Sequence, residues 1–146
     1  MSEAHAPLPV MLPPAELAVR VYYEDTDAGG VVFFPNYLKF FERARTEWLR
    51  SLGYEQSRMA LDHQRIFVIR NLDMAYRKPA RLDDLLTIRT LVTRVGRASI
   101  HFAQRALRGT ELLAEGTIEV CCVDADSLKP AGLPANLRAT LEFIQG

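Results

Sequence analysis

The sequence lacks an excess of either charge, because 18 basic side chains (Lys and Arg) are balanced by 18 acidic ones (Asp and Glu) in 146 residues. Without a net positive charge, the chain has no general attraction for nucleic acid or for an anionic membrane. Cysteine is scarce as well, and the only two, Cys121 and Cys122, are neighbours whose side chains point to opposite faces of a strand. We interpret them as packing residues in a reducing, cytoplasmic setting, and not as a disulfide or a zinc site.

Long apolar runs are also missing, since none reaches the roughly 20 residues that span a bilayer. The first residues do not resemble a secretory signal, because Glu3 stands where positive charge is expected and prolines interrupt the apolar residues. We therefore expect no membrane span. Residues 1–15 are expected to form a flexible, proline-rich lead-in, and residues 16–146 a single domain with a core of its own.

Unusual residue types do converge in one stretch, residues 21–53. It begins at the end of an alternating strand pattern, 17–23, and continues into an acidic loop, 24–27, that holds three carboxylates. Gly29 and Gly30 follow and give the backbone freedom for positive φ and for close approach of another group. An apolar cluster, 31–34, then places a hydrophobic wall next to the acidic loop.

One long amphipathic helix completes this stretch, over residues 37–52, with Asn36 as its N-cap and Gly53 as its left-handed stop. At a helical rise per residue it is about 24 Å long. Its apolar residues recur at spacings of three and four and form one stripe: Tyr37, Phe40, Phe41, Ala44, Trp48 and Leu52.

The remaining chain changes period after a short helical turn within residues 54–64. Even-numbered positions are apolar through four segments, although Arg70, Thr90 and Gln104 break the rule. The apolar positions are Ile66, Val68, Leu72, Met74, Tyr76, Leu86, Ile88, Val92, Ile100, Phe102, Ala106, Leu112, Ala114, Ile118, Val120 and Cys122. Breaks at Lys78-Pro79, Gly96 and Gly109 predict an antiparallel meander. Pro134 opens a terminal helix with an apolar face of Leu137, Leu141 and Ile144.

These elements predict an α+β fold, in which a five-stranded antiparallel sheet wraps round one long helix. Such a sheet has free edges and a second face, and these invite pairing with another copy of the chain. We therefore expect a homodimer or a homotetramer.

The run from Tyr23 to Val32, followed by Pro35-Asn36-Tyr37 and by Glu42-Arg43-Ala44-Arg45, resembles the hotdog-fold acyl-CoA thioesterases. The most similar members are the hydroxybenzoyl-CoA thioesterase class and its Tol-Pal-associated acyl-CoA thioesterase branch. The resemblance extends over about residues 17–123, because 83–88 also resembles the third strand of that family.

This resemblance implies hydrolysis of acyl-CoA thioesters without a metal or another cofactor. It implies that Asp27 is the catalytic carboxylate and that the backbone N–H of Phe34 polarises the thioester carbonyl. Tyr37 is expected to border the acyl pocket. The resemblance also assigns the CoA phosphates to Arg94 and Arg97, which flank the turn at Gly96.

Elementary chemistry is compatible with these roles but leaves alternatives open. A helix N-terminus offers unpaired donors to a developing oxyanion, and a carboxylate can attack directly or activate water. Asp27 could instead satisfy a turn, for which Asp25 is the better candidate, and the two arginines could be solvated turn residues. Phe33-Phe34 replaces the Tyr-His of the Tol-Pal branch, so the acyl group, aliphatic or aromatic, stays open.

Two alternative functions are compatible with the same fold. One is a hotdog hydratase or dehydratase, although that chemistry uses a histidine together with a carboxylate and the acidic loop has none. The other is a non-catalytic acyl-thioester binding protein.

Overall fold

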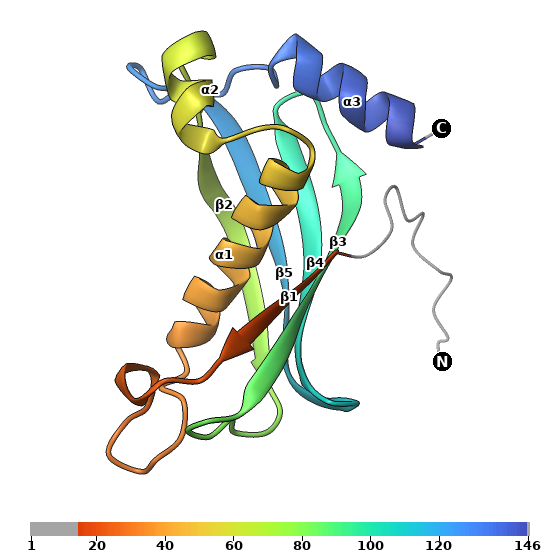
Figure 1. Ribbon diagram of the computed structural model, residues 1–146. Coiled ribbons are helices and arrows are strands. Elements are labelled where there is room, and N and C mark those ends of the chain that lie inside the picture. Colours follow the sequence, from red (N-terminus) through yellow and green to blue (C-terminus); the bar gives the residue numbers. More distant parts are fainter. Residues whose placement is uncertain (1–14, 146) are drawn as a thin grey trace.

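Five antiparallel strands form one sheet that curls around the long helix α1 (Asn36–Ser51) in the computed structural model, which describes residues 15–145 (Figure 1). The strands are β1 (Ala15–Arg20), β2 (Arg65–Tyr76), β3 (Leu85–Val95), β4 (Ser99–Arg108) and β5 (Glu111–Asp124). Two shorter helices, α2 (Gln56–His63) and α3 (Ala135–Gln145), lie at the end of the sheet that is uppermost in Figure 1. The predicted α+β arrangement is confirmed.

The strand order in the sheet is β1-β3-β4-β5-β2. The predicted meander was therefore wrong in the position of one strand, β2. The hairpins β3–β4 and β4–β5 are adjacent as expected, with Gly109 at φ +62° in the second turn. β2, however, pairs with β5 and not with β3. The reason is that β3 already has β1 on one side and β4 on the other, so the free side of β5 is the place left for β2.

The apolar stripe of α1 faces the sheet as predicted. Tyr37, Phe40, Phe41, Ala44 and Trp48 are all buried in the main core cluster, and Leu52 packs against it. The helix begins one residue earlier than expected, with Pro35 at the cap position. The prediction of Asn36 as N-cap was therefore wrong, because its side-chain amide donates to the backbone oxygen of Asp25 at 2.8 Å instead. Gly53 has the expected positive φ, +90°.

The polar residues that interrupt the strand pattern, Thr90 and Gln104, still face the core and are buried. The Gln104 side-chain amide donates to the Thr90 hydroxyl at 2.9 Å and to the backbone oxygen of Phe41 at 3.0 Å. Its carbonyl oxygen accepts a hydrogen bond from the Arg45 guanidinium at 2.9 Å. These polar groups are tolerated in the core because they form hydrogen bonds with one another and with the backbone.

The predicted face of β2 was wrong for its first half. A register shift between Ile69 and Asn71 inserts Arg70 as an extra residue, and such a bulge exchanges the two faces of a strand. Phe67 and Ile69 therefore lie opposite the core residues Cys122 and Val120, whereas Ile66 and Val68 face the other way. Beyond the bulge, Leu72, Met74 and Tyr76 point toward the helix side as expected, opposite Ile118, Gly116 and Ala114.

The two ends of the described chain differ from the predictions in detail. The proposed lead-in, 1–15, lies outside the described residues except for Ala15, which begins β1. The first strand ends at Arg20, earlier than predicted, and Tyr23 is 82% exposed in a short 3-10 turn. Leu137 and Leu141 of α3 are buried as expected, whereas the side chain of Ile144 lies outside what the structure describes.

Both cysteines are free and buried, as expected for packing residues, and burial raises the pKa of the Cys122 thiol to about 11. Within residues 15–145, no helix is both long and apolar enough to cross a membrane.

Candidate active site

The acidic loop is tied to the start of α1 by Asp25. Its carboxylate accepts a hydrogen bond from the amide of Tyr22 at 2.8 Å, which closes the 3-10 turn. Its backbone oxygen accepts from the amide of Phe33 at 3.0 Å and from the side chain of Asn36. The structural role expected for Asp25 is confirmed, and the loop is held against the first turn of the helix.

Asp27 is held by one carboxylate oxygen only. Its Oδ1 accepts a hydrogen bond from the amide of Gly29 at 2.8 Å, and its backbone bonds to Gly30 and Val31 complete a tight loop. Gly30 adopts φ +77°, which glycine reaches without strain, and a Cβ on Gly29 would lie 3.3 Å from Asp27 Oδ1. The two glycines therefore allow the tight loop and the close approach of the Asp27 carboxylate to the backbone. Asp27 Oδ2 has no hydrogen-bond partner among residues 15–145. One oxygen therefore fixes the carboxylate and the other is available.

A cavity of about 340 Å³ opens beside Asp27 at the N-terminal end of α1. Phe34 and Tyr37 line it together with Asp27, so the structure brings three of the sequence-predicted site residues together. The amide of Phe34 donates to no acceptor within the part of the chain that the structure describes. It lies just before the first turn of the helix, where the helix dipole favours negative charge.

Aromatic rings form one wall of this cavity. The ring of Tyr76 lies 5.4 Å from that of Phe34 and 5.7 Å from that of Tyr37, measured between centroids. The Tyr37 hydroxyl accepts a hydrogen bond from the amide of Ala80 at 3.2 Å, and burial raises the pKa of Tyr37. Tyr37 is thus a neutral, fixed wall residue. Tyr76 was not predicted as a site residue, because only the strand order brings the end of β2 to this cavity.

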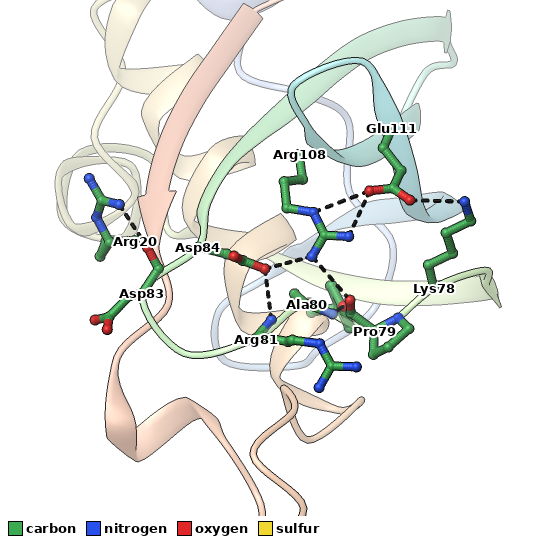
Figure 2. A network of polar contacts seen from close by, with 10 residues as sticks. Arg20, Lys78, Pro79, Ala80, Arg81, Asp83, Asp84, Arg108 and Glu111 are labelled. Carbon is green, nitrogen blue, oxygen red and sulfur yellow. Dashed lines mark hydrogen bonds and ion pairs between the residues drawn. The ribbon is translucent and has the colours of Figure 1, made fainter.

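Arg77, Lys78 and Pro79 continue the wall and were also missed as site residues. The break at Lys78-Pro79 was the only local signal, and it indicated a turn and not a site. An ion-pair network holds this segment in place (Figure 2). Glu111 accepts a hydrogen bond from Lys78 at 2.9 Å and a second from Arg108 at 2.6 Å. These two cations lower the pKa of the Glu111 carboxyl to about 2.

Arg108 is the centre of that network, as Figure 2 shows, because it also donates to the Asp84 carboxylate at 2.7 Å. Asp84 in turn accepts from the amide of Arg81 at 2.9 Å. Between the two anchored ends lies Ala80, whose amide binds Tyr37 and whose backbone oxygen accepts from the amide of Val32 at 2.8 Å. The network therefore positions the backbone that supports both the aromatic wall and the acidic loop.

Arg94 and Arg97 lie far from this cavity within one copy of the chain. They are exposed at the end of β3 and in the turn after it, whereas Asp27 lies near the start of β3. The eleven residues of that strand separate its two ends by about 30 Å. His63 and His101 are not among the cavity residues either. Among residues 15–145, no group of three or more His, Cys, Asp or Glu side chains is arranged to hold a metal ion.

Comparison with known proteins places this cavity in a family context. The family model described as Thioesterase superfamily matches residues 29–115 of this chain. The chain is 46% identical to the acyl-CoA thioesterase YbgC of Haemophilus influenzae, over 87% of this chain and 93% of that protein. It is 47% identical to the acyl-CoA thioester hydrolase YbgC of Escherichia coli, with the same two coverages.

Solved structures show the same fold. A probable thioesterase from Bartonella henselae superposes with a TM-score of 0.80 at 34% identity, over 84% of this chain and 100% of that one. A DHNA-CoA thioesterase from Staphylococcus aureus gives a TM-score of 0.84 at 23% identity, over 90% of this chain and 91% of that one. The second likeness concerns the fold alone.

Proposed function

The chain belongs to the thioesterase superfamily, and from this premise we propose that it hydrolyses acyl-CoA thioesters to a free acid and CoA. Asp27 is the proposed catalytic carboxylate, and the amide of Phe34 is the proposed donor to the thioester oxygen. The observation that carries the proposal is that Asp27, Phe34 and Tyr37 line one cavity at the start of α1. The names of the YbgC relatives support the substrate class.

The proposed chemistry uses the two free groups of the site. The thioester carbonyl oxygen lies at the Phe34 amide, where the helix N-terminus stabilises the negative charge that develops on it. Asp27 Oδ2 faces the carbonyl carbon and either takes a proton from an attacking water or attacks the carbon itself. In both routes the carbon–sulfur bond breaks and CoA leaves as a thiolate that takes up a proton. In the first route the oxygen of the attacking water becomes part of the acid; in the second, water then hydrolyses the mixed anhydride between the acyl group and Asp27, which releases the acid and restores the carboxylate.

The aromatic wall suits the acyl group next to the thioester. Phe34, Tyr37 and Tyr76 present ring surface to the cavity, and the Tyr37 hydroxyl is already engaged by Ala80. The aromatic part of the wall therefore offers apolar and ring-stacking contacts to the acyl carbons nearest the reacting centre.

The test is a thiol-release assay with a thiol-reactive dye on a panel of acyl-CoAs. Asp27→Ala and Asp27→Asn are expected to lower kcat by about 10²–10⁴-fold, the range for loss of a positioned acid–base group. Glu24→Gln is the matched control, because Glu24 is an exposed carboxylate in the same loop. Wild-type turnover in a folded Asp27→Ala protein would refute the assignment, and hydration of crotonyl-CoA without thiol release would favour the hydratase alternative.

We further propose that the active form is at least a homodimer that pairs β2 with β2 of a second copy. β2 is an edge strand, and Val68, Ile69 and Leu72 leave large apolar side chains 40–51% exposed. Free edges of this kind are sites of strand pairing.

Such pairing supports the role assigned to Arg94 and Arg97. Two antiparallel β2 strands place the beginning of one beside the end of the other. Tyr76, at the end of β2, lines the Asp27 cavity, whereas Arg65, at its beginning, donates to the Gly132 oxygen close to Arg97. The arginines of the second copy thus come to the same end of the joined sheet as Asp27 of the first.

Two measurements test this assembly. Light scattering is expected to give a multiple of the chain mass, and Leu72→Asp is expected to shift the protein toward the monomer. Arg97→Ala is expected to raise KM for CoA thioesters more than for short thioesters that lack the nucleotide. Equal effects on both substrates would remove Arg97 from the phosphate site.

A further inference from the structure

A second cavity, of about 240 Å³, lies on the same side of α1 as the first. It is bordered by α1, α2 and the first half of β2, with β4 and β5 beneath. Its walls are largely apolar and include Leu49, Phe67, Ile69 and Phe102, whereas Arg45 is the cation that lines it. Ile69 lines it because of the bulge in β2, which turns this side chain toward the helix.

Arg45 is buried without a charge partner at contact distance. Only 7% of the residue is exposed, and its one hydrogen bond among the described residues goes to the neutral side chain of Gln104. No carboxylate of residues 15–145 lies within ion-pair distance of it. Burial lowers the pKa of Arg45, and the more distant charge of Glu42 opposes this effect. Because a guanidinium has five N–H donors, several remain for a ligand.

The other polar groups of this cavity satisfy one another. The Thr46 hydroxyl donates to the Glu42 carboxylate at 2.5 Å and accepts a hydrogen bond from the Gln56 amide at 2.9 Å. Glu42 is exposed, so water also solvates it. Apart from the second N–H of the Gln56 amide, the unused side-chain donors of the residues that line this cavity therefore belong to Arg45.

The two cavities lie along one side of the helix. Tyr37 lines the first and Arg45 the second, and eight residues of helix place their Cα atoms about 12 Å apart. α1 packs chiefly against β1 and β3, which leaves the inner face of β2 partly uncovered. On that face Leu72, 42% exposed, lies between Tyr76 of the first cavity and Ile69 of the second. Tyr76, Leu72 and Ile69 thus form an apolar strip that runs from one cavity toward the other.

We propose that the second cavity receives the far end of the acyl group and that Arg45 binds a carboxylate there, so that ω-carboxyacyl-CoA thioesters are preferred substrates. This inference rests on the proposed thioesterase function. An apolar strip suits a methylene chain, and a guanidinium forms paired, charge-assisted hydrogen bonds with a carboxylate. An acyl chain that ends in a methyl group would leave the buried guanidinium without its counter-charge, which is unfavourable.

The experiment compares acyl-CoAs matched in length, with and without the terminal carboxylate, by thiol release from the full-length protein. The pairs are hexanoyl- and adipoyl-CoA, octanoyl- and suberoyl-CoA, and decanoyl- and sebacoyl-CoA. At the length that fits, kcat/KM is expected to be at least about tenfold higher for the ω-carboxyacyl member, as for a hydrogen bond to a charged group. Free suberate is expected to inhibit the reaction more strongly than free octanoate.

Three variants locate the preference. Arg45→Met is expected to reduce the ratio of the two kcat/KM values to one or below, and Arg45→Lys to retain part of it. Arg43→Met removes the same charge from the exposed side of the helix, where Arg43 lies over the Phe40 ring, and is expected to keep the wild-type ratio. Circular dichroism checks that each variant is folded.

The outcomes separate the two proposals. If the wild-type protein hydrolyses acyl-CoAs but shows no preference at any length, the inference about Arg45 is overturned and the thioesterase proposal stands. A preference that persists in folded Arg45→Met also overturns it. If no acyl-CoA is hydrolysed, both proposals are wrong. If Arg45→Met does not fold, the ratio of the two kcat/KM values in the wild-type protein and the inhibition by suberate still test the proposal.

Discussion

Replacing Gln104 with methionine removes the centre of the buried polar network while nearly keeping the side-chain shape. Gln104 is fully buried, and three groups depend on it: the Arg45 guanidinium, the Phe41 backbone oxygen and the Thr90 hydroxyl. The variant leaves a buried guanidinium N–H without its acceptor, and it removes the amide donor that the Thr90 hydroxyl and the Phe41 backbone oxygen share. Such losses cost about 1–3 kcal/mol each, so we expect Gln104→Met to lower the free energy of unfolding by about 2–4 kcal/mol.

The assay is urea unfolding at a fixed protein concentration, because an oligomer unfolds in a concentration-dependent manner. A loss of this size corresponds to a decrease in Tm of about 10 °C for a chain of this length. Gln56→Met is the matched control, since Gln56 is only partly buried and donates one hydrogen bond, to Thr46, and it is expected to change the stability by less than about 1.5 kcal/mol.

A double-mutant cycle with Arg45→Met tests the reasoning further. Because the double variant removes donor and acceptor together, its loss is expected to be smaller than the sum of the single losses by about 1 kcal/mol or more. A loss below about 0.5 kcal/mol for Gln104→Met, or additive losses, would refute the view that these groups satisfy one another in the core.

Three further predictions concern the site and its supports. Gly29→Ala places a methyl group 3.3 Å from Asp27 Oδ1 and is expected to lower kcat with little effect on Tm. An unchanged kcat would show that the position of the Asp27 carboxylate is not critical for the reaction. Arg108→Met releases the segment that carries Ala80 and is expected to lower kcat/KM. Arg105→Met is the control, because Arg105 is an exposed arginine of the same strand that pairs with Glu115, and it is expected to lower kcat/KM less. Equal effects of the two substitutions would contradict the positioning role of Arg108. The pKa of the Glu111 carboxyl is lowered from 4.5 to about 2, so its contribution to stability is present above pH 4.5 and is lost as the pH falls toward 2. The difference in urea midpoint between wild type and Glu111→Gln is therefore expected to shrink over that interval, and a pH-independent difference would argue against this ion pair.

Local patterns in the sequence predicted the elements well because each depends on neighbouring residues. The stripe of α1 follows from helical spacing, and Gly53 ends the helix because its positive φ is easily reached only by glycine. The acidic loop was recognisable because its carboxylates and glycines are contiguous. Asp27, Phe34 and Tyr37 lie within eleven residues of the sequence. Their common position at one cavity therefore depends mainly on local structure and little on contacts between distant segments.

The features that were missed or wrong depend on contacts between distant segments. The place of β2 beside β5 is decided by which strand edges remain free, and alternation within a strand carries no information about this. The bulge at Arg70 exchanges the faces of β2, and in the sequence it is marked only by a polar residue at an even-numbered position, which Thr90 and Gln104 show as well without a bulge at those residues. Tyr76 and Lys78 join the site through that topology. Gln104 was noticed as an exception to the pattern, but its partner Arg45 is 59 residues away in the sequence.

The roles proposed for Asp27 and Phe34 are tested by a crystal structure with a ketone analogue of acyl-CoA, in which a methylene group separates the sulfur from the carbonyl carbon. We expect the carbonyl oxygen at about 2.7–3.1 Å from the Phe34 amide nitrogen, with Asp27 Oδ2 facing the carbonyl carbon directly or through one water. A carbonyl group bound away from the start of α1, with no contact to Phe34 or Asp27, would contradict it.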